Sequence, residues 1–364
     1  MSEITKEVIE SVLSEYNLPI LETDPVSGHI VRDISIKDGL VKVDLEMGIP
    51  VEGIRHTIAE ELNSLLKHRT TAEDVLINVT SRIQSHAVQK NVNALKGVKN
   101  VIAVGSGKGG VGKSTVAVNL ALALKEEGAK VGMMDADIYG PSLPTMLGCH
   151  GKAASTDGKT LEPMEAHGIQ CISMGHMLDS DDSPVIWRGP MAVSALQQLL
   201  NDSNWGDLDY LVIDLPPGTG DIQLTLCQNI PVTGAVIVTT PQDISLIDAN
   251  KALKMFEKVS VSVLGVIENM STHICSKCGH EEAIFGSGGG EKMSDRYGIP
   301  LLGQIPLSIE IREGVDQGEP TVISEPESPV TNSFTMIARQ VAAEISRKPK
   351  DFSAKMPKIV IENK

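Results

Sequence analysis

The glycine-rich stretch "VGSGKGGVGKST", residues 104–115, decides the fold of most of this 364-residue chain. Within it, "GKGGVGKS" (107–114) has the spacing G-x-x-x-x-G-K-[ST] of a phosphate-binding loop. An apolar run, "VIAV" (101–104), precedes the loop, and the helix-like segment "STVAVNLALALKEEG" (114–128) follows it. We therefore expect a turn between a strand and a helix, whose backbone N–H groups surround the phosphates of a nucleotide.

The residues of this loop have separate expected roles. Lys113 is expected to contact the β- and γ-phosphates of ATP, Ser114 to bind Mg²⁺, and Thr115 to donate a hydrogen bond to a phosphate oxygen. The other expected ATP-binding positions are Gly107, Lys108, Gly109, Gly110, Val111 and Gly112.

Three carboxylates follow two apolar strand candidates. "YLVIDLPPGTGD" (210–221) supplies Asp214, expected to reach Mg²⁺ through a water molecule, and "KVGMMDADIYGPS" (130–142) supplies Asp135 and Asp137. If the second strand continues through both residues, their side chains emerge on the same side. Asp137 is then the candidate for orienting the attacking water, with Asp135 in the outer shell of the metal. The alternative for this pair is a helix cap and a turn residue.

Apolar strands alternate with helices over residues 99–347. This pattern indicates an α/β fold with a mostly parallel, doubly wound sheet that is covered on both faces. The expected strands are 101–106, 130–137, 169–174, 209–214, 234–240, 263–269 and 300–306, and the expected helices are 113–127, 190–201, 220–229, 243–258 and 330–346.

Residues 1–85 have a different pattern. A helix (3–16), two alternating runs around "KDGL" (29–36 and 40–47), a second helix (52–68) and a strand (74–83) predict a small α+β domain. The polar segment 86–98 is the expected linker, and the basic tail 348–364 is expected to be disordered.

Composition narrows the classes of partner. A formal net charge of −15 argues against a nucleic-acid binder, and no apolar stretch is long enough to predict a membrane span. Five cysteines, an odd and sparse set, favour a reducing compartment, so we expect a cytoplasmic protein.

Lys108, in the loop "KGGVGKST", gives the first resemblance to a known family. The loop resembles the deviant Walker A motif of the MinD, ParA and nitrogenase iron-protein class of ATPases. The resemblance implies that Lys108 reaches the nucleotide of a second subunit and that hydrolysis is coupled to dimerisation. A lysine at that place stabilises charge that develops during phosphoryl transfer.

Further blocks resemble the Mrp/ApbC family of iron–sulfur cluster carriers: "DADIYGPSLP" (135–144), "WRGPM" (187–191), "DYLVIDLPPGTGD" (209–221), "TTPQDISLID" (239–248), "ENMSTHICSKCGH" (268–280) and "IPLSIEIREGVDQGEP" (305–320). This resemblance implies that Asn269 contacts the adenine and that Pro306, after the last strand, packs on the base. Residues 1–85 resemble the SufT/PaaD-like domain, but "EMGIPVEGIR" (46–55) lacks the cysteine often found there. For this domain we therefore expect partner docking or regulation.

The motif "CSKCGH" contains Cys275 and Cys278, whose two thiolates cannot complete a four-sulfur site. A two-fold dimer would bring two such pairs together, and the family resemblance implies that they share one [4Fe–4S] cluster. The alternatives are a Zn²⁺ site that includes His273 or His280, and a redox dithiol. The other cysteines, at 149, 171 and 227, are expected to be isolated small apolar residues.

Together with the family resemblance, these observations predict an ATP-hydrolysing homodimer that carries a [4Fe–4S] cluster and transfers it to apo iron–sulfur proteins. Assembly factors are further expected partners. Neither nucleic acid nor membrane is an expected partner. Three alternatives remain: a ParA- or MinD-like partitioning or positioning ATPase, a zinc-binding nucleotide switch, and a sensor that binds nucleotide without hydrolysing it.

Overall fold

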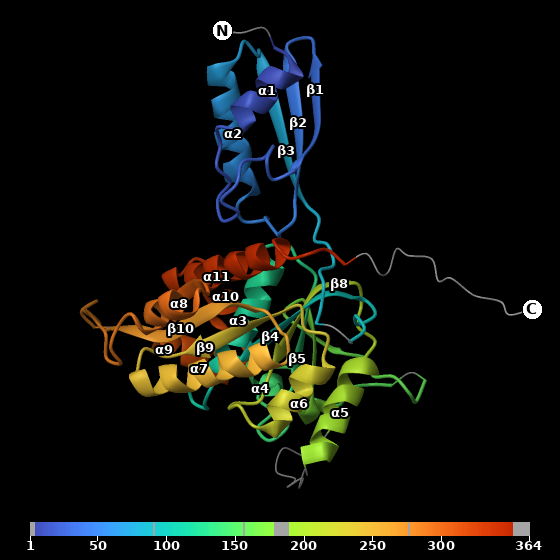
Figure 1. The fold of residues 1–364 in the computed structure, drawn as a ribbon, viewed down its shortest axis with the longest axis vertical. Helices are drawn as coiled ribbons and strands as arrows, with labels where there is room; N and C mark the ends of the chain where they lie inside the picture. The colour runs from blue at the N-terminus through green and yellow to red at the C-terminus, as the bar shows by residue number, and fades with distance from the viewer. Residues whose placement is uncertain (1–3, 90–91, 156, 178–188, 276, 352–364) are drawn as a thin grey trace, which may run out of the picture.

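A computed structural model describes residues 4–89, 92–155, 157–177, 189–275 and 277–351. Two sheets organise the chain: a three-stranded sheet near the N-terminus and a nine-stranded sheet formed by the rest (Figure 1). Among the described residues, no helix is long and apolar enough to cross a membrane.

The N-terminal unit packs two helices on a sheet with strand order β1-β2-β3. Its turn at Asp38 and Gly39 has positive φ at both residues, 48° and 79°, which suits a two-residue hairpin, so β1 and β2 pair antiparallel as expected. β3 returns after the second helix and pairs parallel to β2. The elements are α1 (Lys6–Leu13), β1 (Val31–Lys37), β2 (Leu40–Met47), α2 (Arg55–Arg69) and β3 (Asp74–Ser81).

The large sheet has the strand order β11-β10-β9-β4-β8-β5-β7-β6, and β12 pairs with β10. All its pairings are parallel except those of β6 with β7 and of β11 with β10 at the edges, which confirms the doubly wound α/β class. Its strands are β4 (Val98–Gly105), β5 (Val131–Asp135), β6 (Met164–Ala166), β7 (Ile169–Ser173), β8 (Leu208–Asp214), β9 (Gly234–Thr239), β10 (Val263–Ile274), β11 (Glu281–Glu282) and β12 (Leu301–Leu307).

Helices cover both faces of this sheet (Figure 1). One core contains the buried side chains of α3 and α11, and the other contains those of α5, α6 and α7. The helices of this part are α3 (Lys113–Glu126), α4 (Leu143–Met146), α5 (Gly189–Asn201), α6 (Asp221–Asn229), α7 (Asp243–Lys258), α8 (Gly289–Tyr297), α9 (Ile309–Asp316), α10 (Thr321–Ser324) and α11 (Pro329–Ser346), with a 3₁₀ turn, η1 (Met174–Met177).

The N-terminal unit sits against the ends of α3 and α11. The backbone N–H of Glu52 donates to the carbonyl of Glu127 (3.0 Å), and the Arg347 guanidinium donates to the carbonyls of Ile20 (3.3 Å) and Leu21 (3.4 Å). Buried apolar side chains of the small sheet are continuous with those around α3. The two sheets are therefore joined by a packed contact as well as by the chain.

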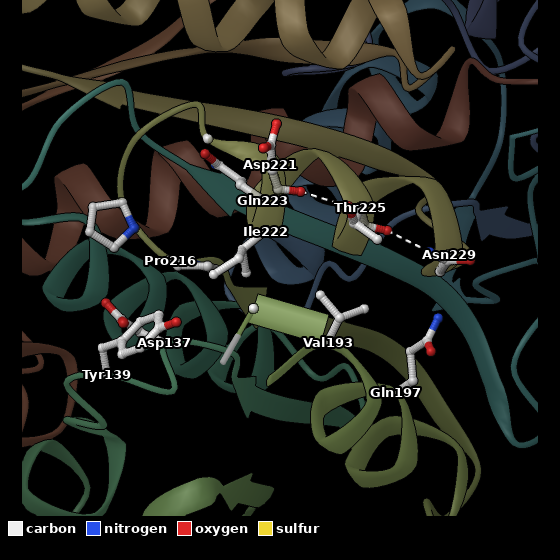
Figure 2. Close-up of a pocket in the computed structure, with 13 residues that line it drawn as sticks. Asp137, Tyr139, Val193, Gln197, Pro216, Asp221, Ile222, Gln223, Thr225 and Asn229 are labelled. Atoms are coloured by element: carbon white, nitrogen blue, oxygen red, sulfur yellow. Dashed lines mark hydrogen bonds between the residues drawn. The ribbon is translucent and has the colours of Figure 1, made fainter. Parts of the chain in front are cut away.

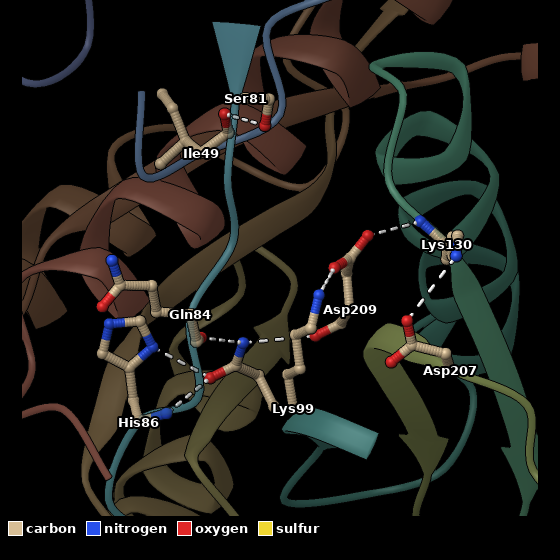
Figure 3. A network of polar contacts seen from close by, with 9 residues as sticks. Ile49, Ser81, Gln84, His86, Lys99, Lys130, Asp207 and Asp209 are labelled. Atoms are coloured by element: carbon tan, nitrogen blue, oxygen red, sulfur yellow. Dashed lines mark hydrogen bonds and ion pairs between the residues drawn. The ribbon is translucent and has the colours of Figure 1, made fainter. Parts of the chain in front are cut away.

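The segment after β3 is fixed to the large sheet by polar contacts (Figure 3). Asn100 Oδ1 accepts from the backbone N–H of His86 (3.2 Å) and lies 3.0 Å from His86 Nδ1, while Asn100 Nδ2 donates to the carbonyl of Gln84 (2.9 Å). Lys350, which belongs to the segment expected to be the tail, forms a β-bridge with His86. Residues 352–364 lie outside the described part of the chain.

Several elements differ from the sequence expectation. β5 ends at Asp135 and does not include Asp137, while β10 continues beyond residue 269 to Ile274. Pro306 lies within β12, so its expected place after the last strand is wrong. The helices α4, α8, α9 and α10 and the edge strands β6 and β11 were not expected, because each is short and lacks a long periodic pattern.

Candidate active site

The carboxyl ends of three parallel neighbours, β4, β8 and β5, meet at one edge of the large sheet. Beyond the strand ends, Leu215 N donates to the carbonyl of Val104 (3.0 Å) and Ala136 N donates to that of Asp214 (2.8 Å). These bonds place the glycine-rich loop after β4 beside the acidic residues that follow β8 and β5. Such an edge is the usual ligand site of an open α/β sheet.

The loop has the strained backbone that only its glycines tolerate. Gly110 and Gly112 have φ of 79° and 77°, in the left-handed region, and α3 begins directly after them at Lys113. At Gly107, a Cβ would overlap the backbone of Asp248 and Ala249 in α7. The sequence pattern and the geometry therefore agree on a phosphate-binding loop at a helix N-terminus.

Lys113 points into the sheet edge and is buried. Its Nζ lies 2.5 Å from Asp214 Oδ1 and 3.2 Å from Ser114 Oγ. An ammonium, a hydroxyl and a carboxylate thus meet within hydrogen-bond distance, which is the set of groups that Mg²⁺ and phosphate oxygens need. Ser114 and Asp214 are the residues that would hold Mg²⁺, which would supply positive charge to offset that of the phosphates.

Asp135 is buried, and its carboxylate accepts hydrogen bonds mainly from nearby backbone N–H groups. Its Oδ1 accepts from Asp137 N (2.9 Å), and its Oδ2 accepts from Ser142 N (3.0 Å), Leu143 N (3.2 Å) and Ser173 Oγ (3.2 Å). The strand does not continue to Asp137, so the condition for a same-side pair is not met. The bonds of Asp135 instead close a turn with Asp137 and hold the chain at the start of α4. Burial, together with the charge of Asp214, raises the pKa of Asp135 to about 7.

Asp137 is half-buried and lines a cavity of about 930 Å³ (Figure 2). Tyr139 stands beside it, Val193 of α5 lies along one wall, and Ile222 of α6 lies along another. Burial raises the pKa of Asp137, whereas the charge of Lys113 lowers it. The candidate for orienting water therefore adjoins both the phosphate loop and an open space between two helices.

Lys108 lies within the loop and is half-buried. Ser106 Oγ donates to its carbonyl (2.9 Å). Within the described part of the chain, its ammonium makes no ion pair. Its backbone is thus held by Ser106.

Asn269, the expected adenine contact, supports the phosphate loop directly. Its Nδ2 donates to the carbonyl of Val111 (2.9 Å), and the amide lies against Gly112. Asn269 belongs to β10, whose pairing with β12 shifts register between Asn269 and His273. Met270, inside that shift, has φ of 57°.

The same strand β10 leads into the cysteine loop. Cys275 N donates to the carbonyl of His280 (2.9 Å), and Gly279 N donates to that of Cys275 (2.8 Å), which closes a tight turn with an exposed Cys278. Backbone N–H groups of Lys277 and Cys278 lower the pKa of Cys275. His273 Nδ1 lies 3.3 Å from the carbonyl of Leu307. Among the described residues, no group of three or more His, Cys, Asp or Glu side chains could hold a metal ion.

Sequence reasoning missed one cluster. Cys149 and Cys171 were expected to be isolated, but their Sγ atoms lie 3.3 Å apart, with His176 beside them. Their separation of 22 residues and their positions on different elements gave no signal of this contact. Cys227 is buried in α6, as a small apolar residue would be.

Comparison with known proteins agrees with this arrangement. Residues 97–342 match the ParA family of NUBPL iron-transfer P-loop NTPases, and residues 6–79 match the iron–sulfur cluster assembly protein family. The chain belongs to the iron-transfer P-loop NTPases. Membership in this family confirms the resemblance that the motifs indicated and makes the chain a P-loop ATPase.

Known proteins are similar to this chain over most of their length. The iron-sulfur cluster carrier protein of Escherichia coli K12 is 50% identical over 344 residues, which are 94% of this chain and 93% of that protein. A nucleotide-binding protein from Archaeoglobus fulgidus, solved with ADP and cobalt, is 38% identical with a TM-score of 0.57, over 66% of this chain and 93% of its own. The cell division ATPase MinD of Pyrococcus furiosus, 24% identical with a TM-score of 0.50 over 66% of this chain and 98% of its own, shares the fold.

Proposed function

We propose that this iron-transfer NTPase is an ATP-hydrolysing homodimer that holds a [4Fe–4S] cluster between two copies of the Cys275–Cys278 loop and delivers it to apo iron–sulfur proteins. The observation that carries the proposal is the path of β10. Asn269, near the middle of the strand, donates to the carbonyl of Val111 in the phosphate loop, and the strand ends one residue before Cys275. One strand thus joins the nucleotide site to the cysteines.

The cysteine loop has the properties expected of a site that binds a transferable iron–sulfur cluster. Cys278 is exposed, Cys275 is half-buried, and the lowered pKa of Cys275 favours the thiolate that binds iron. Each chain supplies two thiolates there, and a [4Fe–4S] cluster takes four. A two-fold axis through the loop supplies the other two, and the exposed loop leaves the cluster accessible to a recipient protein.

Lys108 supports the same dimer. Lys108 is half-buried within the phosphate loop, and its ammonium has no ion-pair partner within the described residues. We propose that it contacts the phosphates bound by the partner subunit, where a cation stabilises the charge of phosphoryl transfer. A related protein, at 38% identity, was solved with ADP, which supports ATP and ADP as the nucleotides of this site.

Within one subunit the reacting groups have separate roles. Lys113 holds the phosphates, and Ser114 and Asp214 hold Mg²⁺. Asp137 orients the attacking water, and Asp135, through its bonds to Asp137 N and Ser142 N, fixes the backbone that carries Asp137. Asp135 is therefore a positioning residue in this proposal rather than part of the metal's outer shell.

Residues 1–85 form a docking domain in this proposal, with 86–98 as its connection and 99–347 as the ATPase domain. The match to iron–sulfur cluster assembly proteins over residues 6–79 supports a role with assembly factors or recipients. The odd and sparse set of five cysteines favours a reducing compartment, so the cytoplasm is the proposed place of action.

Anaerobic reconstitution with iron and sulfide tests the proposal. Wild type should take up about four iron and four sulfide per dimer, and light scattering should report a dimer. Cys275→Ala should lose the cluster, whereas the matched control Cys227→Ala, which changes a buried cysteine of α6, should keep it. Uptake of zinc without any cluster, or an equal loss in both variants, would overturn the carrier proposal.

A further inference from the structure

A second pair of cysteines lies inside the ATPase part, away from the exposed loop. Cys149 follows α4, and Cys171 lies in β7, where it pairs with Met133 of β5. Their Sγ atoms are 3.3 Å apart, about 1.3 Å more than the ~2.05 Å of a disulfide bond. A shift of this size is within the reach of a loop residue such as Cys149.

The surroundings of the pair exclude metal binding by its nearest imidazole. His176 Nε2 donates to the carbonyl of Cys149 (2.9 Å), and its Nδ1 accepts from Ser173 N (3.2 Å). Both ring nitrogens are therefore engaged, and two sulfurs alone make an incomplete site. Thiol chemistry between Cys149 and Cys171 is the reaction that this arrangement permits.

The two sulfurs are unequal. Cys149 is 7% exposed, whereas Cys171 is fully buried. The hydrogen bond with Cys171, and to a smaller extent the one with His176, lowers the pKa of Cys149, against the opposing effect of burial. Of the two thiols, Cys149 is thus the less buried one and the one whose thiolate is favoured, which suits it for attack, with Cys171 as the resolving thiol.

We propose that Cys149 and Cys171 form a reversible redox site: hydrogen peroxide oxidises them to a disulfide, and this slows ATP hydrolysis. The Cys149 thiolate attacks one peroxide oxygen, the O–O bond breaks, and a sulfenic acid and hydroxide result. The sulfur of Cys171 then displaces the sulfenic oxygen, which leaves as water with the thiol proton. Two electrons pass from the sulfurs to peroxide, and a dithiol reductant returns them.

A path of contacts leads from this pair to the reacting groups. His176, bonded to Cys149 O, accepts from Ser173 N, and Ser173 Oγ donates to Asp135 Oδ2 (3.2 Å). Asp135 in turn accepts from Asp137 N. From the other side, Cys149 N donates to the carbonyl of Pro144 in α4 (2.9 Å). Formation of the disulfide draws Cys149 toward Cys171 in β7 and therefore moves the segment between Asp137 and α4.

The test uses full-length protein in which Cys275→Ser and Cys278→Ser remove the exposed thiols, leaving three cysteines. After hydrogen peroxide, thiol titration of the denatured protein should fall from three to one, and peptide mass spectrometry should find residues 149 and 171 linked. ATP turnover, relative to the same protein before oxidation, should fall at least about fivefold and return with dithiothreitol.

Three further variants of this parent make the outcome decisive. Cys171→Ser and, separately, Cys149→Ser should keep their own ATP turnover through the peroxide treatment, and Cys227→Ser should remain as sensitive as the parent. The proposal is overturned if no link between 149 and 171 forms, if the link forms with turnover unchanged, or if both single variants are inactivated like the parent. Each variant is compared with its own reduced form. If either Cys149→Ser or Cys171→Ser fails to fold, the other variant still tests the proposal.

Discussion

The ion pair between Glu127 and Arg339 joins the end of α3 to α11, directly beneath the N-terminal unit. Arg339 Nη2 lies 2.7 Å from Glu127 Oε1, and Arg339 Nε lies 3.0 Å from Oε2. The two side chains are only 12% and 5% exposed. A Cβ on Gly53 would contact this pair, so the N-terminal unit covers it. We predict that Arg339→Met destabilises the ATPase part strongly.

The magnitude follows from burial. Removing one partner of a buried, bidentate pair leaves a desolvated carboxylate, which costs about 3–5 kcal/mol. With a urea slope of roughly 3 kcal/mol/M for a domain of this size, the unfolding midpoint should fall by about 1 M or more. Glu127→Gln combined with Arg339→Met should recover at least about 1 kcal/mol relative to the sum of the single changes, because no unpaired charge remains.

Tryptophan fluorescence in urea measures this effect selectively, because both tryptophans, Trp187 and the buried Trp205, belong to the ATPase part of the sequence. The matched control is Arg312→Met, whose side chain is 63% exposed in its pairs with Glu313 and Asp316. Pairs of this kind contribute about 0–1 kcal/mol. A midpoint shift for the Arg339 variant no larger than that of the Arg312 variant would refute the reasoning.

Three other predictions follow from single contacts. Asn269→Ala removes the bond to Val111 and should weaken ADP binding about tenfold by calorimetry; an unchanged Kd would contradict this role. Asp137→Asn should lower kcat by about 10²–10⁴ with Kd for nucleotide nearly unchanged, and an unaffected kcat would favour the non-hydrolysing sensor. Burial, aided by Lys350, lowers the pKa of His86, so stability is lost as pH falls from about 6.5 through that lowered pKa. The His86→Gln variant should lack this loss, which amounts to at most about 1.4 kcal/mol of unfolding free energy per pH unit. Urea midpoints of wild type and variant near pH 7.5 and 5.5 measure the difference, and an equal loss in both proteins would contradict the prediction.

The parts of the fold that could be predicted from sequence are those with strong local patterns. The hairpin at "KDGL" and the helix after the phosphate loop were predicted because turn residues, glycine spacing and apolar periodicity act locally. Short edge elements, such as β6 and β11, have two or three residues and no pattern to detect. Their formation depends on the strands beside them.

The residues of the candidate site could also be predicted only where a local motif defines them. Lys113 and Ser114 follow from one motif. The structure brings Asp214, 101 residues after Lys113, to 2.5 Å from it because β4 and β8 are neighbours. The role of Asp135 required knowing where β5 ends. The contact between Cys149 and Cys171 depends on packing between a loop and a strand, which no spacing in the sequence encodes.

In our proposal, the path of β10 lets the phosphate site and the cluster-binding cysteines affect each other in one chain. Cys275 follows Asn269 by six residues, about 20 Å along an extended strand. Between them, the register shift against β12 and the positive φ of Met270 store strain of about 1–3 kcal/mol. In our proposal, closing the dimer over ATP changes the position of Val111 and hence of Asn269, and relaxation of the strand at Met270 changes how Cys275 is presented to the cluster.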